Sequence, residues 1–280
     1  MRARLRIPTG EPSATLREAV SFFRQHTTPV TAVGIASFGP VDLDPRSPTF
    51  GFITTTPKPG WAHTDVAGPF RTGLDVPVAF DTDVNGAALG EHVWGAGRGI
   101  DPLVYLTVGT GIGGGGVVHG RLLHGLVHPE MGHLRIPHDR GDDPFPGVCP
   151  YHGDCLDGLA SGRALAERWG APAQTLPAGH RAWELETEYL ALGLVGIIGV
   201  LSPRRIVVGG GVLEHPPLLP RVRRRVVELL AGYIDTRELG SDVDTYIVPP
   251  GLGEDAGVLG ALALAQTTLA ARRSEPSRAE

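Results

Sequence analysis

The chain has 280 residues, of which 41% are hydrophobic and 20% are charged, and its formal net charge at pH 7 is −5. This length provides material for one large packed core or two modest ones, and the composition is typical of a water-soluble globular protein. The acidic balance argues against nucleic acid as a partner, because phosphate binding needs concentrated positive charge and no face-long run of arginine is present.

Strands and helices are expected to alternate along the chain, with polar loops after the strands, and this pattern predicts an α/β fold. Expected helices cover 13–25 (capped by Ser13), 83–92, 161–169, 183–201, 218–231 and 258–270. Expected strands cover 30–37, 76–80, 103–108, 115–118, 205–208 and 245–248. The third and fourth strands flank a glycine-rich turn, so part of the sheet is expected to be antiparallel.

The most apolar run, 189–201, is too short to cross a bilayer and contains three glycines. The N-terminus has basic residues but no apolar segment after them, so it does not look like a signal peptide. We therefore expect no membrane association and a cytoplasmic location.

Both cysteines lie in one short segment that also holds a histidine. Together with an upstream histidine they give the pattern His133-x15-Cys149-x2-His152-x2-Cys155. Four nitrogen and sulfur donors at this spacing suit a structural, tetrahedral zinc ion. The alternative is a Cys149–Cys155 disulfide with unrelated histidines, which an oxidising compartment would favour.

Acidic residues that could carry chemistry stand at three places. Asp83 follows a predicted strand and opens a helix, where it could accept a proton from an attacking hydroxyl or simply cap the helix. Asn85 could bind a hydroxyl or the local backbone. Glu130 lies three residues before His133, and Asp157 two residues after Cys155, so the metal could brace a loop that presents acids to a polar substrate.

Two glycine-rich segments follow predicted strands. In the first, 109–116, backbone N–H groups could point at an anion, and Thr110 adds a hydroxyl. The second covers 209–211, and 257–260 opens a helix rich in small residues. Both later segments suit the approach of a nucleotide as well as tight helix packing.

Taken in order, these segments resemble the ROK family of sugar kinases, most of all its bacterial fructokinase branch. The resemblance extends from Arg6 to about Ala270. It rests on ASFGPVDL (36–43), FDTDVNGAALGE (80–91), LTVGTGIGGG (106–115), HPEMGH (128–133), CPYHGDCLDGLASG (149–162) and VVGGGV (207–212).

The resemblance implies an actin-like, ribonuclease-H-like two-domain fold with the active site between the domains. It implies transfer of the γ-phosphoryl group of ATP, with Mg²⁺, to the 6-hydroxyl of a hexose, with Asp83 as the general base. The implied sugar contacts are Gly39, Asn85, Glu130, His133 and Asp157. The implied ATP contacts are Thr110, Gly111, Gly113, Gly209, Gly210, Gly211 and Val212. A structural zinc on His133, Cys149, His152 and Cys155 and a homodimer are implied as well.

The expected small domain covers 1–100, joined by the C-terminal helix 259–271, and the expected large domain covers 101–258 with the zinc-binding loop 133–155. The family's first strand, with a D-x-G-G-T-type phosphate loop, has no counterpart in this sequence. Residues 1–9 align with a strand some twenty residues into a typical member. Truncation is expected, and a neighbouring strand would then have an unpaired edge. Asp157 replaces the family's usual glutamate, and Arg163 follows LASG where relatives often have proline or threonine.

Two functions remain open at this point. The first is a fructokinase-like hexose kinase, for which glucose or mannose are alternative substrates because a few hydrogen bonds decide the choice. The second is a catalytically impaired sugar-binding or regulatory protein that lacks the first phosphate loop.

Overall fold

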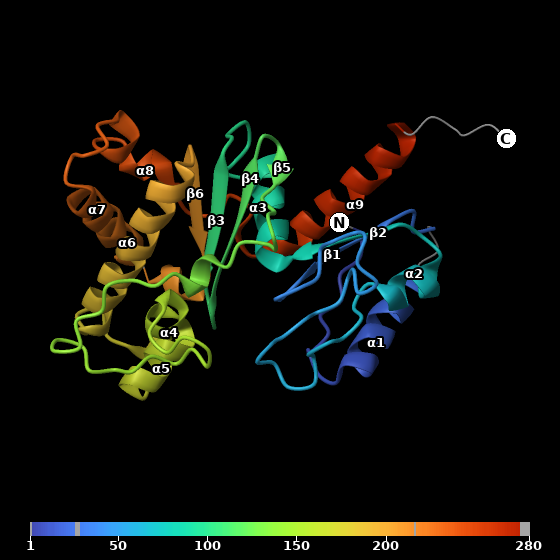
Figure 1. Ribbon diagram of the computed structural model, residues 1–280, viewed down its shortest axis with the longest axis horizontal. Coiled ribbons are helices and arrows are strands. Elements are labelled where there is room, and N and C mark those ends of the chain that lie inside the picture. Colours follow the sequence, from blue (N-terminus) through green and yellow to red (C-terminus); the bar gives the residue numbers. More distant parts are fainter. Residues whose placement is uncertain (1, 26–28, 216, 275–280) are drawn as a thin grey trace.

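The computed structural model describes residues 2–25, 29–215 and 217–274. Its elements form two lobes; helix α3 lies between them, and helix α9 packs against α3 and runs across the sheet of the first lobe (Figure 1). The first lobe is defined by the two-stranded sheet β1–β2 with α1 and α2, and the second by a five-stranded sheet with α4–α8. The domain limits 1–100 and 101–258 stay a prediction.

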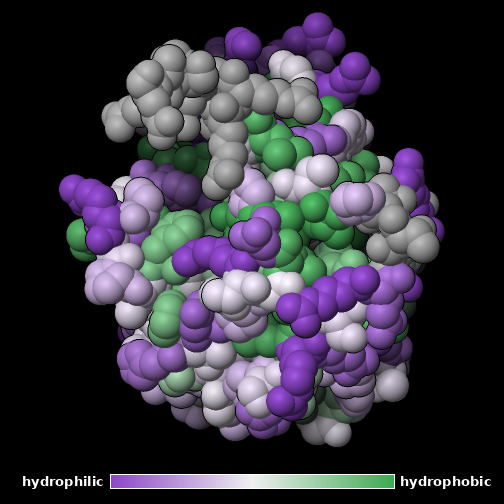
Figure 2. Space-filling view, turned by 90° about the vertical axis from the view of Figure 1, so that its right-hand side faces the viewer, coloured by the Kyte–Doolittle hydropathy of each residue, from purple (hydrophilic) through white to green (hydrophobic). Residues whose placement is uncertain are grey.

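The first lobe consists of α1 (Pro12–Arg24), β1 (Val33–Ser37), α2 (Gly68–Leu74) and β2 (Val78–Thr82). The N-cap of α1 is Glu11, whose carboxylate accepts the N–H groups of Ser13 and Ala14, so the expected cap at Ser13 is wrong. β1 and β2 are parallel, and among the described residues β1 pairs with β2 alone. The first lobe's side of the molecule shows hydrophobic residues between hydrophilic ones across its middle (Figure 2).

The second lobe contains a mixed sheet in the order β5-β4-β3-β6-β7. β3 is antiparallel to β4 and parallel to β6, which confirms the expected antiparallel part. The strands are β3 (Leu103–Val108), β4 (Ile112–Val118), β5 (Arg121–Leu122), β6 (Arg205–Gly209) and β7 (Ile247–Val248). The helices are α4 (Leu156–Ala160), α5 (Gly162–Trp169), α6 (Ala182–Leu201), α7 (Leu218–Leu230) and α8 (Val243–Tyr246). Short 3₁₀ helices cover Met131–His133, Ala173–Thr175, Gly211–Glu214, Arg237–Leu239 and Gly253–Asp255.

Side-chain alternation along β3 buries both faces of this sheet. Val104, Leu106 and Val108 join the core that contains α6, whereas Leu103 and Tyr105 pack with residues of α3 (Asp83–Trp94). This follows from the two-residue period of a strand. The sheet is therefore covered by α6 on one face and by α3 on the other.

Helix α9 (Ala256–Ser274) packs against α3, β1 and β2 through backbones that approach closely. A Cβ on Gly260 would lie 1.9 Å from the Gly86 carbonyl oxygen, and one on Gly34 would lie 1.8 Å from the Ala261 carbonyl oxygen. Only glycine allows this approach. Gly260 therefore allows α9 to pack closely against α3. This is the tight helix packing that was one of the two interpretations of segment 257–260.

The structure differs from the expected elements at several places. The strand expected at 245–248 is α8 followed by the two-residue β7, and β1 begins at Val33 rather than at residue 30. Residues 2–10 form no strand, although the family resemblance led us to expect one at residues 1–9, of which residue 1 lies outside the described residues. α2 lies between the strands expected at 30–37 and 76–80, where no helix was expected. None of the helices in the described ranges combines the length and the apolar character needed to span a bilayer.

Candidate active site

Asp83 lies where β2 ends and α3 begins. The N-cap is Thr82, whose hydroxyl accepts the N–H of Asn85 at 3.1 Å, so the expectation that Asp83 might merely cap the helix is wrong. Asp83 is exposed, and its Oδ1 accepts the N–H of Val84 at 2.8 Å. Desolvation by the surrounding protein raises the pKa of Asp83 above the usual value. A carboxylate in this state can accept a proton from a bound hydroxyl.

Asn85 is fully buried below Asp83. Its Nδ2 donates to Asp81 Oδ1 at 2.8 Å, and its Oδ1 accepts the N–H of Gly116 at 3.2 Å. The amide therefore ties the start of α3 to β4 and does not face a ligand, which corrects the expected sugar contact.

The pair Asp81 and His124 connects the end of β2 to the segment after β5. Asp81 is also buried, and its Oδ2 lies 2.8 Å from His124 Nε2. This hydrogen bond raises the pKa of His124, while partial burial opposes the rise.

Glu130 is partly exposed and lies close to the other acids. Its pKa is raised to about 7, first by burial and then by the negative charges of Asp83 and Asp157. One oxygen lies 3.4 Å from His128 Nδ1 and the other 3.9 Å from His133 Nε2. The three acids Asp83, Glu130 and Asp157 thus share one electrostatic environment, although they come from three separate segments.

The glycine turn between β3 and β4 is shorter than expected. The β3–β4 ladder extends to the pair Val108–Ile112, so Gly113 pairs with Thr107 inside β4 and only 109–111 form the turn. Thr110 and Gly111 are exposed at its tip. The expected place of Gly113 in the turn is wrong, because the strand pairing continues past it.

The turn is held from below by the segment that follows the cysteines. Asp157 Oδ1 accepts the N–H of Ile112 at 2.7 Å. The Gly109 carbonyl accepts the N–H of Gly162 at 2.8 Å, and the Thr110 carbonyl accepts the N–H of Arg163 at 3.2 Å. Arg163 also donates from Nη2 to the Val148 carbonyl at 2.6 Å, so it joins the turn to the cysteine segment.

The glycines after β6 lie at the same sheet edge as the turn. β3 and β6 are parallel and Thr107 pairs with Gly209, so both strands end side by side. Gly210 has φ of 99°, and a Cβ there would lie 2.3 Å from the Val108 carbonyl oxygen. Val212 is buried beside Gly162. The edge thus brings together two of the segments expected to bind ATP.

The four expected metal ligands gather in one cluster. The donor atoms of His133, Cys149, His152 and Cys155 lie within 4.8 Å of one another. His133 Nδ1 is 3.5 Å from Cys155 Sγ and 3.6 Å from Cys149 Sγ, and His152 Nδ1 is 3.5 Å from Cys149 Sγ. Zn–S and Zn–N bonds at a tetrahedral angle place S and N about 3.6 Å apart. The cluster therefore fits a tetrahedral zinc ion, and the two cysteines are free thiols rather than the alternative disulfide.

Gly39 lies beside His128, a histidine for which no role was expected. A Cβ on Gly39 would be 3.4 Å from His128 Cε1, and His128 Nε2 accepts the N–H of Val41 at 3.1 Å. Sequence reasoning missed His128, Asp81 and His124. The one available signal was that His128 opens the same HPEMGH segment as Glu130 and His133.

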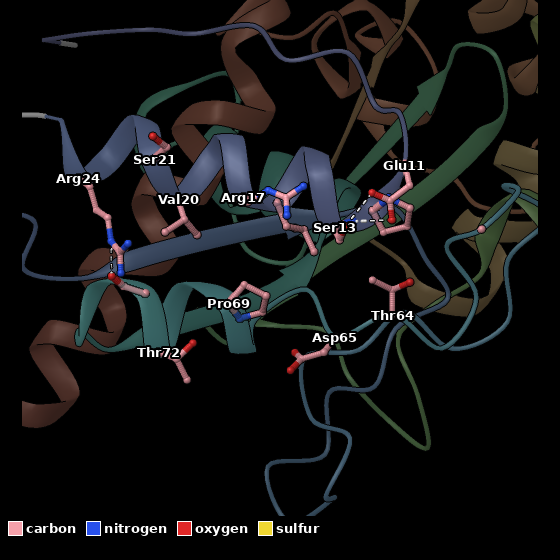
Figure 3. A pocket seen from close by; sticks show the side chains of 14 residues that line it. Glu11, Ser13, Arg17, Val20, Ser21, Arg24, Thr64, Asp65, Pro69 and Thr72 are labelled. Carbon is pink, nitrogen blue, oxygen red and sulfur yellow. Dashed lines mark hydrogen bonds between the residues drawn. The ribbon is translucent and has the colours of Figure 1, made fainter.

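A groove of about 720 Å³ lies elsewhere, between α1 and α2 (Figure 3). Its Glu11, Asp65 and Arg24 side chains are bound to nearby backbone groups. None of the expected site residues lines it. The groove therefore lacks the converging polar groups seen around Asp83, and the candidate active site is placed at Asp83.

Comparisons with known proteins agree with this geometry. The sequence profile of the ROK family matches residues 1–268. The fructokinase of Zymomonas mobilis subsp. mobilis is 47% identical over 269 residues, covering 93% of this chain and 87% of that protein. The ROK hexokinase structure from Thermus thermophilus has a TM-score of 0.77 at 25% identity, covering 95% of this chain and 90% of that one. A ROK family glucokinase from Streptomyces griseus, in complex with glucose and AMPPNP, has a TM-score of 0.70 at 25% identity, covering 92% and 89%.

Proposed function

The chain belongs to the ROK family, and from this membership we propose that it transfers the γ-phosphoryl group of ATP to the 6-hydroxyl of D-fructose. It has the actin-like two-domain fold of the ROK sugar kinases. The observation that carries the proposal is the position of the Asp83 side chain. Asp83 lies at a strand end and is exposed, and it is not the cap of α3, because Thr82 takes that role.

Asp83 is the general base in this proposal. Its carboxylate accepts the proton of the sugar 6-hydroxyl while the hydroxyl oxygen attacks the γ-phosphorus and the bond to ADP breaks. The raised pKa supports this role, because a more basic carboxylate is a better proton acceptor. Positioning and charge stabilisation supply most of the remaining rate, since phosphoryl transfer asks little covalent chemistry of the protein.

The sugar site is proposed to contain Gly39, Glu130, His133 and Asp157. Glu130 is partly exposed between two histidines, and the hydrogen bond to Ile112 engages only one oxygen of Asp157. A carboxylate with a free oxygen can accept hydrogen bonds from sugar hydroxyls. Asn85 is given a positioning role instead, because it is buried and bound at both ends.

The nucleotide is proposed to lie over the edge where β3 and β6 end. Thr110 and Gly111 would meet the phosphates, and Gly209, Gly210, Gly211 and the backbone of Val212 would meet the adenosine. Exposure of the turn tip supports the first assignment. ATP brings Mg²⁺, which neutralises developing charge on the phosphate oxygens.

Zinc is proposed as a structural ion on His133, Cys149, His152 and Cys155. Four protein donors at tetrahedral spacing leave no position for a reacting water. The ion would fix His133 through Nδ1, which leaves Nε2 toward Glu130. Thiolate ligands suit a reducing compartment, which supports a cytoplasmic location. The family resemblance supports a homodimer, and light scattering after gel filtration measures it.

The experiment is ATP turnover by the purified full chain with fructose, glucose and mannose, followed by ³¹P NMR of the product. Fructose 6-phosphate with the highest kcat/KM for fructose is the expected result. A higher kcat/KM for glucose or mannose would correct the substrate. Sugar binding without any turnover would favour the sugar-binding or regulatory alternative.

A further inference from the structure

His128 is a buried histidine that contacts segments of both lobes. Its side chain is 3% exposed, so it is shielded from any ligand in solution. It lies between the loop after β1 and the 3₁₀ helix Met131–His133. The proposed sugar contacts Gly39 and Glu130 are on these two sides of the ring.

On one side, the ring accepts a hydrogen bond from the first lobe. The N–H of Val41 points at His128 Nε2 across 3.1 Å, and Val41 is itself 3% exposed. A backbone N–H is always the donor, so Nε2 carries no proton in this bond. The single proton of the neutral ring is then on Nδ1. Burial lowers the pKa of His128, which agrees with a neutral ring.

On the other side, Nδ1 faces acceptors of the second lobe. It lies 3.4 Å from Glu130 Oε1 and 3.4 Å from the Pro129 carbonyl oxygen. The other oxygen of Glu130 lies 3.9 Å from His133 Nε2, and the Nδ1 of His133 faces the cysteine sulfurs. A continuous set of contacts therefore runs from the first lobe to the cluster of expected metal ligands. Its members are Val41, His128, Glu130 and His133.

The ring also fixes how closely the first-lobe loop can approach. A Cβ on Gly39 would be 3.4 Å from Cε1 and 3.5 Å from Nε2, so this loop already packs directly on the imidazole. A change at His128 would release the Val41 N–H and leave a buried donor without a partner. The loop would then move relative to Glu130.

We propose that His128 is a positioning residue that sets the separation of the Gly39 loop and Glu130, and through them the affinity for the sugar. The inference rests on the proposed kinase function. It assigns the decisive contact to the Val41 N–H and Nε2, and the ring itself does not touch substrate.

The test compares His128→Gln with His128→Asn. The Gln amide oxygen can reach the place of Nε2, whereas the Asn amide reaches only the place of Nδ1. We expect His128→Asn to raise KM for fructose about tenfold. His128→Gln should stay within about threefold, and KM for ATP should stay within about twofold in both. Zinc content should equal that of the parent. Equal KM for fructose in both variants, or an equal rise in KM for ATP, would overturn the proposal.

A second measurement uses the parent protein alone. Long-range ¹H–¹⁵N NMR of the histidine rings reports which nitrogen carries the proton. The expected signal for His128 is a neutral ring with the proton on Nδ1, and a proton on Nε2 would overturn the proposal even if neither variant folds. Parent turnover with fructose tests the proposed function separately, since the tautomer does not depend on activity.

Discussion

Asp157 Oδ1 accepts a hydrogen bond from the backbone N–H of Ile112 at 2.7 Å, and this bond connects the cysteine segment to the glycine turn. Asp157 stands two residues after Cys155 in the sequence. Arg163 makes a second connection between the same two segments. The metal cluster and the proposed phosphate-binding turn are therefore mechanically joined.

Replacing Asp157 with alanine removes the acceptor of a buried N–H. The Asp157→Ala variant should lose about 1–3 kcal/mol of unfolding free energy. Its KM should rise for ATP as well as for fructose, because the turn loses its support. Asp157→Asn keeps an oxygen at the same distance and serves as the control, with stability near that of the parent. Denaturant unfolding and steady-state kinetics measure both, and an alanine variant with parental stability would contradict the contact.

Replacing Cys155 with serine removes one donor of the metal cluster. We expect zinc, measured by mass spectrometry, to fall from about one ion per chain to a small fraction. The melting temperature should fall with it, because metal binding contributes folding free energy. His119→Asn changes an exposed histidine outside the cluster and is the control. Full zinc content in Cys155→Ser would show that the cluster is not the metal site.

The raised pKa of Asp83 predicts the direction in which kcat/KM changes with pH. The base works when it is deprotonated, so kcat/KM should fall as the pH falls through the pKa of Asp83. The acid limb should therefore lie above pH 3.8, the usual aspartate value. Glu130 and Tyr105 are titratable neighbours that interact with Asp83.

Glu130→Gln is the control for this pH profile. It should weaken fructose binding but keep the acid limb. A limb that disappears in Glu130→Gln would assign the titration to Glu130 instead.

The contact between α3 and α9 predicts a difference between two glycines of the same helix. A Cβ on Gly260 would collide with the Gly86 carbonyl, so Gly260→Ala should cost about 1–3 kcal/mol of stability. Gly257 has open space around it, and Gly257→Ala should be neutral or stabilising by up to about 1 kcal/mol. Thermal unfolding of both variants checks this, and equal melting temperatures would contradict the close packing.

Local patterns in the sequence predicted the elements that have a single strong signal. The apolar runs gave the range of β3 and nearly that of α6, and the spacing of two cysteines and two histidines gave a cluster that the fold assembles. Tertiary context decided the rest. The cap of α1 is Glu11 rather than Ser13, and Gly113 lies in β4 rather than in the turn because it pairs with Thr107 of β3.

The site showed the same division. Asp83, Glu130 and Asp157 were found by residue type and position, and the fold brings them near one another. His128 was missed because its role depends on Val41, which is 87 residues away in the chain. Asn85 was misread because its partners Asp81 and Gly116 belong to different strands. Contacts between distant segments leave no pattern in one sequence.

The most direct test of the account is the rate of fructose 6-phosphate formation by Asp83→Asn and by the parent, at saturating ATP and fructose. The asparagine keeps the size of the side chain and removes its basicity, so kcat should fall about 10²–10⁴-fold while fructose still binds. Retention of the parental kcat by a folded, zinc-loaded Asp83→Asn protein would contradict the assignment of Asp83 as the base.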